Sequence, residues 1–238
     1  MLKGRAVLLD FDHTLFDTDR FFWVDVKKAF ARFGIDERAW EEAYEAVWPM
    51  GYSLEKHLAS LTRLETRDWR RETTSFRLQS PVPGLQSALR DTFSDLSGYL
   101  YPDVVPFLEE ARRRGFDLYL LSFGDPSWQG YKVRASGIAP YFKEVFYTKR
   151  EQTKAETVGG IGDRYDVIYA IDNDPRELDL MKVCYPQLLT HLISRVPPEA
   201  VEAGDPETRY RFCEARRYVG LPFEHPHHLC TTLAEVVL

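Results

Sequence analysis

The chain has 238 residues, of which 44% are hydrophobic and 29% are charged, and its formal net charge is −6. This length allows one large domain or a domain with an insertion. The acidic balance gives no electrostatic reason to expect nucleic acid or an anionic membrane as a partner, whereas a small anionic substrate is compatible with a locally positive site. No apolar run approaches the ~20 residues that a membrane-spanning helix needs.

The cysteines and the amino terminus indicate where in the cell the protein is expected to reside. Cys184, Cys213 and Cys230 form neither a C-x-x-C pair nor a zinc-like spacing. Such a sparse, odd count is typical of a reducing environment. The apolar stretch after residues 1–5 is too short for a signal peptide, and no small-residue cleavage site follows it. We therefore expect a cytoplasmic protein; its oligomeric state, monomer or weak dimer, is open.

The first predicted element is a buried strand at residues 6–9, which is apolar on both faces and runs into acidic residues. Residues 16–98 differ from it, because apolar residues recur there at helical spacing and no strand-like run occurs. We interpret this stretch as an all-helical insertion, with hinges at residues 16–19 and 98–103. One of its helices is expected to begin behind a cap at Asp36.

Beyond the insertion, helical and strand-like patterns alternate. A helix over residues 104–111 is expected to end at Gly115. Four more strand-like runs follow, at residues 118–121, 144–147, 167–171 and 188–193. Alternation of this kind predicts a Rossmann-like parallel sheet covered by helices on both faces. The expected domains are an α/β core of residues 1–15 and 99–238 and a helical segment of residues 16–98. Residues 197–228 receive no assignment.

Two acids, Asp10 and Asp12, stand where the first strand ends. Residues i and i+2 of a strand point the same way, so both carboxylates can converge on one cation or reacting group. Like charges repel, and Mg²⁺ is the cation expected for carboxylate and water ligands. One Asp can also attack as a nucleophile while the second moves a proton. The alternative is a solvated pair of acids in a turn.

Ser122 ends the second strand and precedes Phe123 and Gly124. A hydroxyl and free backbone N–H groups can hold a phosphate oxygen, although a Ser-x-Gly turn is common without one. Lys154 falls in the first turn of a helix whose start is marked by a capping box. A cation there opposes the helix dipole, which an anionic ligand would explain; an exposed lysine is the alternative. Lys149 is a rival for this role.

A third acidic position follows the strand at residues 167–171. Asp172 is suited to share a metal ion with Asp10, and Asn173 can ligate or donate a hydrogen bond. Asp174 is expected to cap the next helix, with Pro175 at its first position. The histidines within residues 225–228 have no acid or cysteine placed by spacing, so we interpret them as a surface or packing feature.

These segments, in this order, resemble the motifs of the haloacid dehalogenase-like (HAD) superfamily. The first motif is Asp10-Phe11-Asp12-His13-Thr14, the second is Ser122 after an apolar strand, the third is Lys154, and the fourth is the acidic cluster of residues 171–178. The resemblance covers residues 5–14 and about 98–193. The helical insertion is similar to the C1-type cap of this superfamily.

The resemblance implies a Mg²⁺-dependent phosphohydrolase that acts on a small phosphorylated metabolite through an aspartyl-phosphate. Asp10 would be the nucleophile and a metal ligand, and Asp12 the general acid/base with its carbonyl on the metal. Ser122 and Lys154 would bind the phosphoryl group, together with the backbone after Ser122. Asp172 would complete the metal site. The acid at Asp12 favours phosphoryl transfer over dehalogenation, because the dehalogenase branch lacks it.

Two residues depart from the superfamily pattern. His13 stands where Gly is frequent, and Asn173 stands where many members carry a second Asp. The motifs leave open a phosphotransferase, mutase or dehalogenase on the same scaffold. They also leave open a receiver-like switch, which an insertion after the first strand disfavours, and a catalytically silent binding protein.

Overall fold

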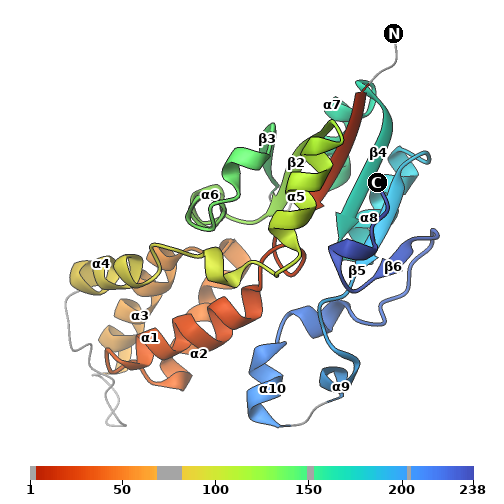
Figure 1. The fold of residues 1–238 in the computed structure, drawn as a ribbon. Helices are drawn as coiled ribbons and strands as arrows, with labels where there is room; N and C mark the ends of the chain where they lie inside the picture. Colours follow the sequence, from red (N-terminus) through yellow and green to blue (C-terminus); the bar gives the residue numbers. More distant parts are fainter. Residues whose placement is uncertain (1–3, 69–81, 149–152, 203–204) are drawn as a thin grey trace.

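The computed structural model describes residues 4–68, 82–148, 153–202 and 205–238. Within them a parallel sheet of six strands forms the centre, in the order β3-β2-β1-β4-β5-β6 (Figure 1). The five predicted strands are confirmed, and β6 adds a sixth at the end of the unassigned segment. The strands are β1 (Gly4–Asp10), β2 (Phe116–Phe123), β3 (Glu144–Thr148), β4 (Tyr165–Asp172), β5 (Leu189–Ile193) and β6 (His228–Cys230).

Helices cover both faces of the sheet, as the alternating pattern predicts. Successive residues of β1 point to opposite faces. Val7 and Leu9 belong to the same apolar cluster as α5 (Val104–Arg113), and Leu8 belongs to a second cluster with α7 (Lys154–Gly162) and α8 (Pro175–Cys184). Helix α6 (Pro126–Ala135) packs beside β3. The predicted stop of α5 is confirmed at Gly115, whose φ of 79° places it in the left-handed region that glycine favours.

The insertion between β1 and β2 is helical throughout its described part (Figure 1). Asp36 caps α2 as predicted, because its carboxylate accepts a hydrogen bond from the backbone N–H of Ala39 at 2.8 Å. Its elements are the π-helix η1 (Arg20–Val26), α1 (Lys27–Ala31), α2 (Glu37–Val47), the 3₁₀ turn η2 (Trp48–Met50), α3 (Leu54–Asp68), α4 (Val82–Thr92) and the 3₁₀ turn η3 (Ser97–Tyr99). We call residues 16–98 the cap segment.

The two predicted hinges lie beside each other. The N–H of Asp17 donates to the carbonyl of Tyr99 at 2.8 Å, and that of Tyr101 donates to Leu15 at 3.1 Å. These bonds hold the cap segment next to the carboxyl ends of the strands, where ligands bind in open α/β sheets. One cluster of buried apolar side chains runs through both parts, and the division into two domains at these hinges stays a prediction.

The segment without a sequence assignment folds against the cap segment. It contains α9 (Pro198–Val201), α10 (Pro206–Arg211) and the 3₁₀ turn η5 (Ala215–Tyr218), and it extends below the sheet in Figure 1. Arg211 forms a bidentate pair with Asp17 in the first hinge, with one N–H···O distance of 2.8 Å. We call residues 197–228 the C-terminal segment. Among the described residues, no helix combines the length and hydropathy that crossing a bilayer requires.

Candidate active site

Asp10 and Asp172 stand at the carboxyl ends of the neighbouring strands β1 and β4. The ammonium of Lys154, at the start of α7, lies between them. Its Nζ donates to Oδ1 of Asp10 at 2.7 Å and to Oδ2 of Asp172 at 2.6 Å. All three side chains are at most 6% exposed. The structure thus brings together two predicted metal ligands and the predicted phosphate-binding lysine.

The charges of Asp10, Asp172 and Lys154 do not balance one another. Burial raises the pKa of Asp10 to about 7, with Lys154 lowering it and Asp172 raising it further. Burial likewise raises the pKa of Asp172. Burial lowers the pKa of Lys154, but the two carboxylates outweigh this effect and raise it above its ordinary value. One ammonium therefore faces two buried carboxylates, and a further cation would relieve their repulsion.

The donor atoms around Asp10 fit Mg²⁺. The carboxylates of Asp10 and Asp172 and the backbone carbonyl of Asp12 are oxygen donors, which this cation prefers. Both neighbours of the Asn173 amide are acceptors, so we assign its nitrogen to this side, from which it donates to the Asp12 carbonyl at 3.1 Å and to Oδ2 of Asp10 at 3.3 Å. The N–H of Asp174 donates to Oδ1 of Asp172 at 2.9 Å. Asn173 therefore orients the ligands, and the position held by the Lys154 ammonium already accommodates a positive charge.

Asp12 is held by three side chains. Lys132 and Thr18 both donate to its Oδ1, and Gln129 donates to its Oδ2 at 2.8 Å. Burial raises the pKa of Asp12, but Lys132 and these hydrogen bonds outweigh it, so the pKa lies below its ordinary value. The sequence did not predict Lys132 or Gln129 as site residues. Their spacing of three places them on one face of α6, and residues 129–132 belong to a connector that also resembles the HAD superfamily.

We expect Lys132→Met to destabilise the fold by about 3 kcal/mol. This is the low end of the range for a buried ion pair that loses one partner, because Lys132 is 3% exposed but Asp12 is 22% exposed. Lys143→Met is the matched control, since its pair with Asp117 is 53% and 42% exposed and should contribute less than about 1 kcal/mol. Urea denaturation measures both. Equal losses of unfolding free energy in the two variants would contradict a larger contribution from the buried Lys132–Asp12 pair.

Ser122 lies one residue beyond the β2 position that pairs with Asp10. Its side chain is fully buried, and its Oγ has no hydrogen-bond partner among the described residues. Buried hydroxyls are nearly always satisfied, so this orphan oxygen favours an absent ligand. The N–H of Gly124 instead donates to the carbonyl of Thr148 at 3.0 Å, and the carbonyl of Phe123 accepts from Gln129 at 2.5 Å. The predicted phosphate contact through the Gly124 N–H therefore lacks a free donor.

The helix starts behave as the sequence predicts. Thr153 caps α7 by accepting from the N–H of Glu156 at 3.3 Å, and Asp174 caps α8 by accepting from Arg176 at 3.0 Å. Lys149 lies outside the described residues. Glu177, for which no role was predicted, accepts a hydrogen bond from the backbone N–H of Lys154 at 3.2 Å. Burial raises the pKa of Glu177. Its contact fixes the first turn of α7 and with it the position of the lysine.

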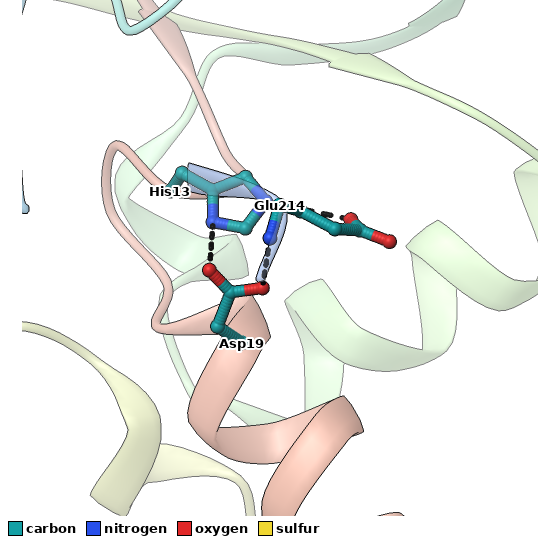
Figure 2. A group of neighbouring side chains, drawn as sticks. All are labelled: His13, Asp19 and Glu214. Atoms are coloured by element: carbon teal, nitrogen blue, oxygen red, sulfur yellow. Dashed lines mark hydrogen bonds and ion pairs between the residues drawn. The ribbon is translucent and has the colours of Figure 1, made fainter. Parts of the chain in front are cut away.

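His13 adopts a left-handed backbone with φ of 62°, and it is the one non-glycine residue with positive φ among the described residues. This conformation costs most side chains roughly 1–2 kcal/mol and explains why Gly is frequent there. Its Nδ1 lies 3.8 Å from Asp19 and its Nε2 lies 3.6 Å from Glu214 (Figure 2). Burial lowers the pKa of His13, but Asp19 and then Glu214 raise it to about 9. The imidazolium pairs offset the backbone strain.

This cluster joins three parts of the chain. Asp19 begins the cap segment, and its carboxylate also accepts the N–H groups of Glu214 and Ala215, both at 2.9 Å. Tyr44 from α2 donates to Oε1 of Glu214 at 2.5 Å. The donor atoms of His13, Asp19 and Glu214 lie within 4.8 Å of one another, a spacing that a metal ion could use. A protonated imidazole already supplies the positive charge there, so we interpret the cluster as an ion triad.

The histidines near the carboxyl terminus have packing partners that their spacing does not reveal. Nδ1 of His227 lies 2.8 Å from the hydroxyl of Thr190, and its Nε2 lies 3.2 Å from Asp179. The rings of His191 and His228 stack at 5.0 Å. These contacts tie β6 and its preceding loop to β5 and α8. They agree with the interpretation of these histidines as a packing feature.

A cavity of about 700 Å³ is lined by Asp10, Asp12 and Lys154. Side chains of the cap segment and Glu214 of the C-terminal segment line it as well. The volume lies within the range of small-molecule sites. The acids that the sequence placed at strand ends therefore open into one ligand-sized space.

Acids at the carboxyl edge of a parallel sheet line a cavity together with a helical segment, as expected for the ligand site of an α/β fold. Residues 5–172 match the family model of the haloacid dehalogenase-like hydrolases. The chain belongs to this family, as its motifs predict. No curated protein matches the chain.

Solved structures with the same fold span nearly the whole chain. A protein from Burkholderia xenovorans LB400, described as a haloacid dehalogenase-like hydrolase, is 19% identical with a TM-score of 0.62, and the match covers 98% of this chain and 94% of that one. L-2-haloacid dehalogenase from Xanthobacter autotrophicus is 17% identical with a TM-score of 0.57, covering 99% and 96%. The magnesium-bound HAD-hydrolase YfnB from Bacillus subtilis is 14% identical with a TM-score of 0.51, covering 98% and 96%. At these identities the likeness concerns the fold.

Proposed function

We propose that this hydrolase is a Mg²⁺-dependent phosphatase that cleaves a small phosphorylated metabolite through an aspartyl-phosphate intermediate. The observation that carries the proposal is the second carboxylate, Asp12, which lines the same cavity as Asp10. A phosphoryl transfer needs a group that moves a proton to and from oxygen, and the dehalogenase branch of the superfamily lacks this acid. The orphan hydroxyl of Ser122, one residue beyond the β2 position that pairs with Asp10, supports a phosphoryl ligand.

In the first step, Oδ of Asp10 attacks phosphorus, the bond from phosphorus to the leaving oxygen breaks, and that oxygen takes a proton from Asp12. In the second, Asp12 takes a proton from water, whose oxygen attacks phosphorus and releases Asp10 and inorganic phosphate. Lys154 and Ser122 hold the phosphoryl oxygens throughout. Bound Mg²⁺ would add positive charge at the phosphoryl group, held by Asp10, Asp172 and the Asp12 carbonyl.

The charged form of Asp12 in the ligand-free protein is the form that the second step requires. Lys132 keeps it charged, and a carboxylate is the form that accepts the proton from water. The first step needs Asp12 to take up a proton when substrate is bound. We further propose that the partner is a small metabolite, with neither nucleic acid nor membrane involved, and that the protein is cytoplasmic, which its three free cysteines support.

Turnover of 4-nitrophenyl phosphate tests the proposal. We expect phosphate release that disappears with a chelator and returns when Mg²⁺ is added. A parallel assay of halide release from 2-chloropropionate should give no product. Halide release without phosphate release would show a dehalogenase and overturn the proposal. A phosphorylated acceptor in place of free phosphate would show a phosphotransferase, and no product in any assay would indicate a binding protein.

A further inference from the structure

Part of the cavity lining, which we call the aromatic wall, consists of rings of the cap segment and of α6. The rings of Phe22 and Tyr52 are 4.7 Å apart, and those of Tyr52 and Trp128 are 5.4 Å apart. The rings of Tyr44 and Trp48 continue the wall at 5.7 Å. All five residues line the cavity. Such a wall offers flat apolar area to whatever the phosphoryl group is attached to.

Three large apolar side chains at the same cavity remain exposed. Trp48 and Met50, in the turn η2, are 38% and 63% exposed, and Phe123, next to Ser122, is 40% exposed. Trp48 and Met50 line the cavity from the cap segment, and Phe123 lines it from the end of β2. Apolar side chains grouped in this way at a cavity indicate a surface that a ligand covers. Phe123 places part of this surface beside the phosphoryl position.

The charged side chains further from Asp10 are already neutralised. Lys56 is paired with Asp125 at 3.0 Å and also donates to two backbone carbonyls, and Arg176 is paired with Asp174 at 2.7 Å. Apart from Lys154, every lysine or arginine among the described cavity residues is paired with an acid, Lys56 with Asp125, Arg176 with Asp174 and Lys132 with Asp12. A second phosphate or carboxylate on the substrate would find no unmatched cation, and burying it unpaired would be costly.

We propose that the leaving group of the substrate is a flat, aromatic alcohol that carries no negative charge of its own. This inference rests on the proposed phosphatase function and narrows it to neutral aryl-type phosphate monoesters. The aromatic wall and the exposed rim supply contact area for the ring system, and the paired cations disfavour substrates with a second anionic group.

The experiment compares kcat/KM for phenyl phosphate, 2-naphthyl phosphate and 4-carboxyphenyl phosphate. We expect 2-naphthyl phosphate to exceed phenyl phosphate about tenfold through its extra apolar area, and the carboxylated ester to fall below phenyl phosphate. Trp48→Ala should shrink the naphthyl-to-phenyl ratio severalfold. Val237→Ala is the control, because Val237 is 80% exposed and lies outside the cavity, and it should leave the ratio unchanged.

A naphthyl-to-phenyl ratio near one, or equal turnover of the carboxylated ester, overturns the inference while leaving the phosphatase function intact. If none of the three esters is hydrolysed but an aliphatic phosphate monoester is, the inference is overturned and the phosphatase function stands. If no phosphate monoester is hydrolysed, the proposed function fails, and binding still tests the inference. Calorimetric titration with 2-naphthylphosphonate and phenylphosphonate needs no chemistry. The naphthyl compound should bind about tenfold more tightly, and equal affinities would overturn the inference.

Discussion

Asp10→Asn is expected to abolish turnover and to leave the fold intact. The amide is neutral and cannot form the aspartyl-phosphate, so kcat should fall on the order of 10⁴–10⁶-fold, as when other covalent catalysts lose their nucleophile. Asn has nearly the same shape as Asp, and Lys154 keeps its bond to Asp172. Initial rates at saturating aryl phosphate measure the loss, and circular dichroism and thermal unfolding check the fold.

Asp117→Asn is the matched control for this substitution. Asp117 lies near the opposite end of strand β2, is 42% exposed and bonds to Lys143, so the change removes a carboxylate far from the cavity. Its rate should stay within about twofold of the parent. Mass spectrometry should first exclude deamidation of the new Asn back to Asp. Undiminished turnover by Asp10→Asn would then contradict the assignment of Asp10 as the nucleophile.

Lys154→Met is expected to affect both activity and metal response. Removing the charge that holds the phosphoryl group should lower kcat by about 10²–10³-fold. Without the ammonium, Asp10 and Asp172 remain buried beside each other, which should cost about 3–5 kcal/mol of stability in the absence of metal. Mg²⁺ then meets no competing ammonium at these carboxylates. Its stabilising effect should therefore be larger in the variant than in the parent protein.

Thermal unfolding with and without Mg²⁺ measures this difference. Lys143→Met again serves as the control, since the Lys143–Asp117 pair is exposed and lies at the amino-terminal end of β2, so its loss should not change the metal response. Equal Mg²⁺-induced shifts in Lys154→Met and in the parent protein would show that Lys154 and the metal do not share these carboxylates. No Mg²⁺ effect on either protein would count against the metal site itself.

The parts of the site that the sequence predicted are those whose geometry is local. Asp10, Ser122 and Asp172 each end a short apolar run, and parallel strands bring their carboxyl ends to one edge whatever lies between them. Lys154 was predicted through the resemblance to the HAD motifs, because the capping box at Thr153 alone left an exposed lysine as the alternative. The strand patterns placed the other three residues together, and the fold class followed from the same patterns.

The missed residues depend on contacts between distant parts of the chain. Lys132 reaches Asp12 from a helix 120 positions away, and its sequence context is that of an ordinary helical lysine. Glu214 reaches His13 from a polar, proline-rich stretch without a clear period. Pro206, which follows Asp205 at the start of α10, repeats the cap-and-proline signature used for α8, and was the signal that could have placed a helix there.

The ion pair between Arg211 and Asp17 determines when the contacts around the first hinge can be completed during synthesis. These residues are separated by 194 positions, so the ribosome makes the hinge long before its partner. At about 5–20 residues per second, the hinge waits on the order of 10–40 seconds for Arg211 and Glu214. Until then Asp17 and Asp19 lack these partners, and His13 has one carboxylate where the finished protein supplies two. A nascent chain can therefore make the hydrogen bonds between the two hinges first, and it completes the contacts around Asp17 and Asp19 only after residues 211–215 have been made.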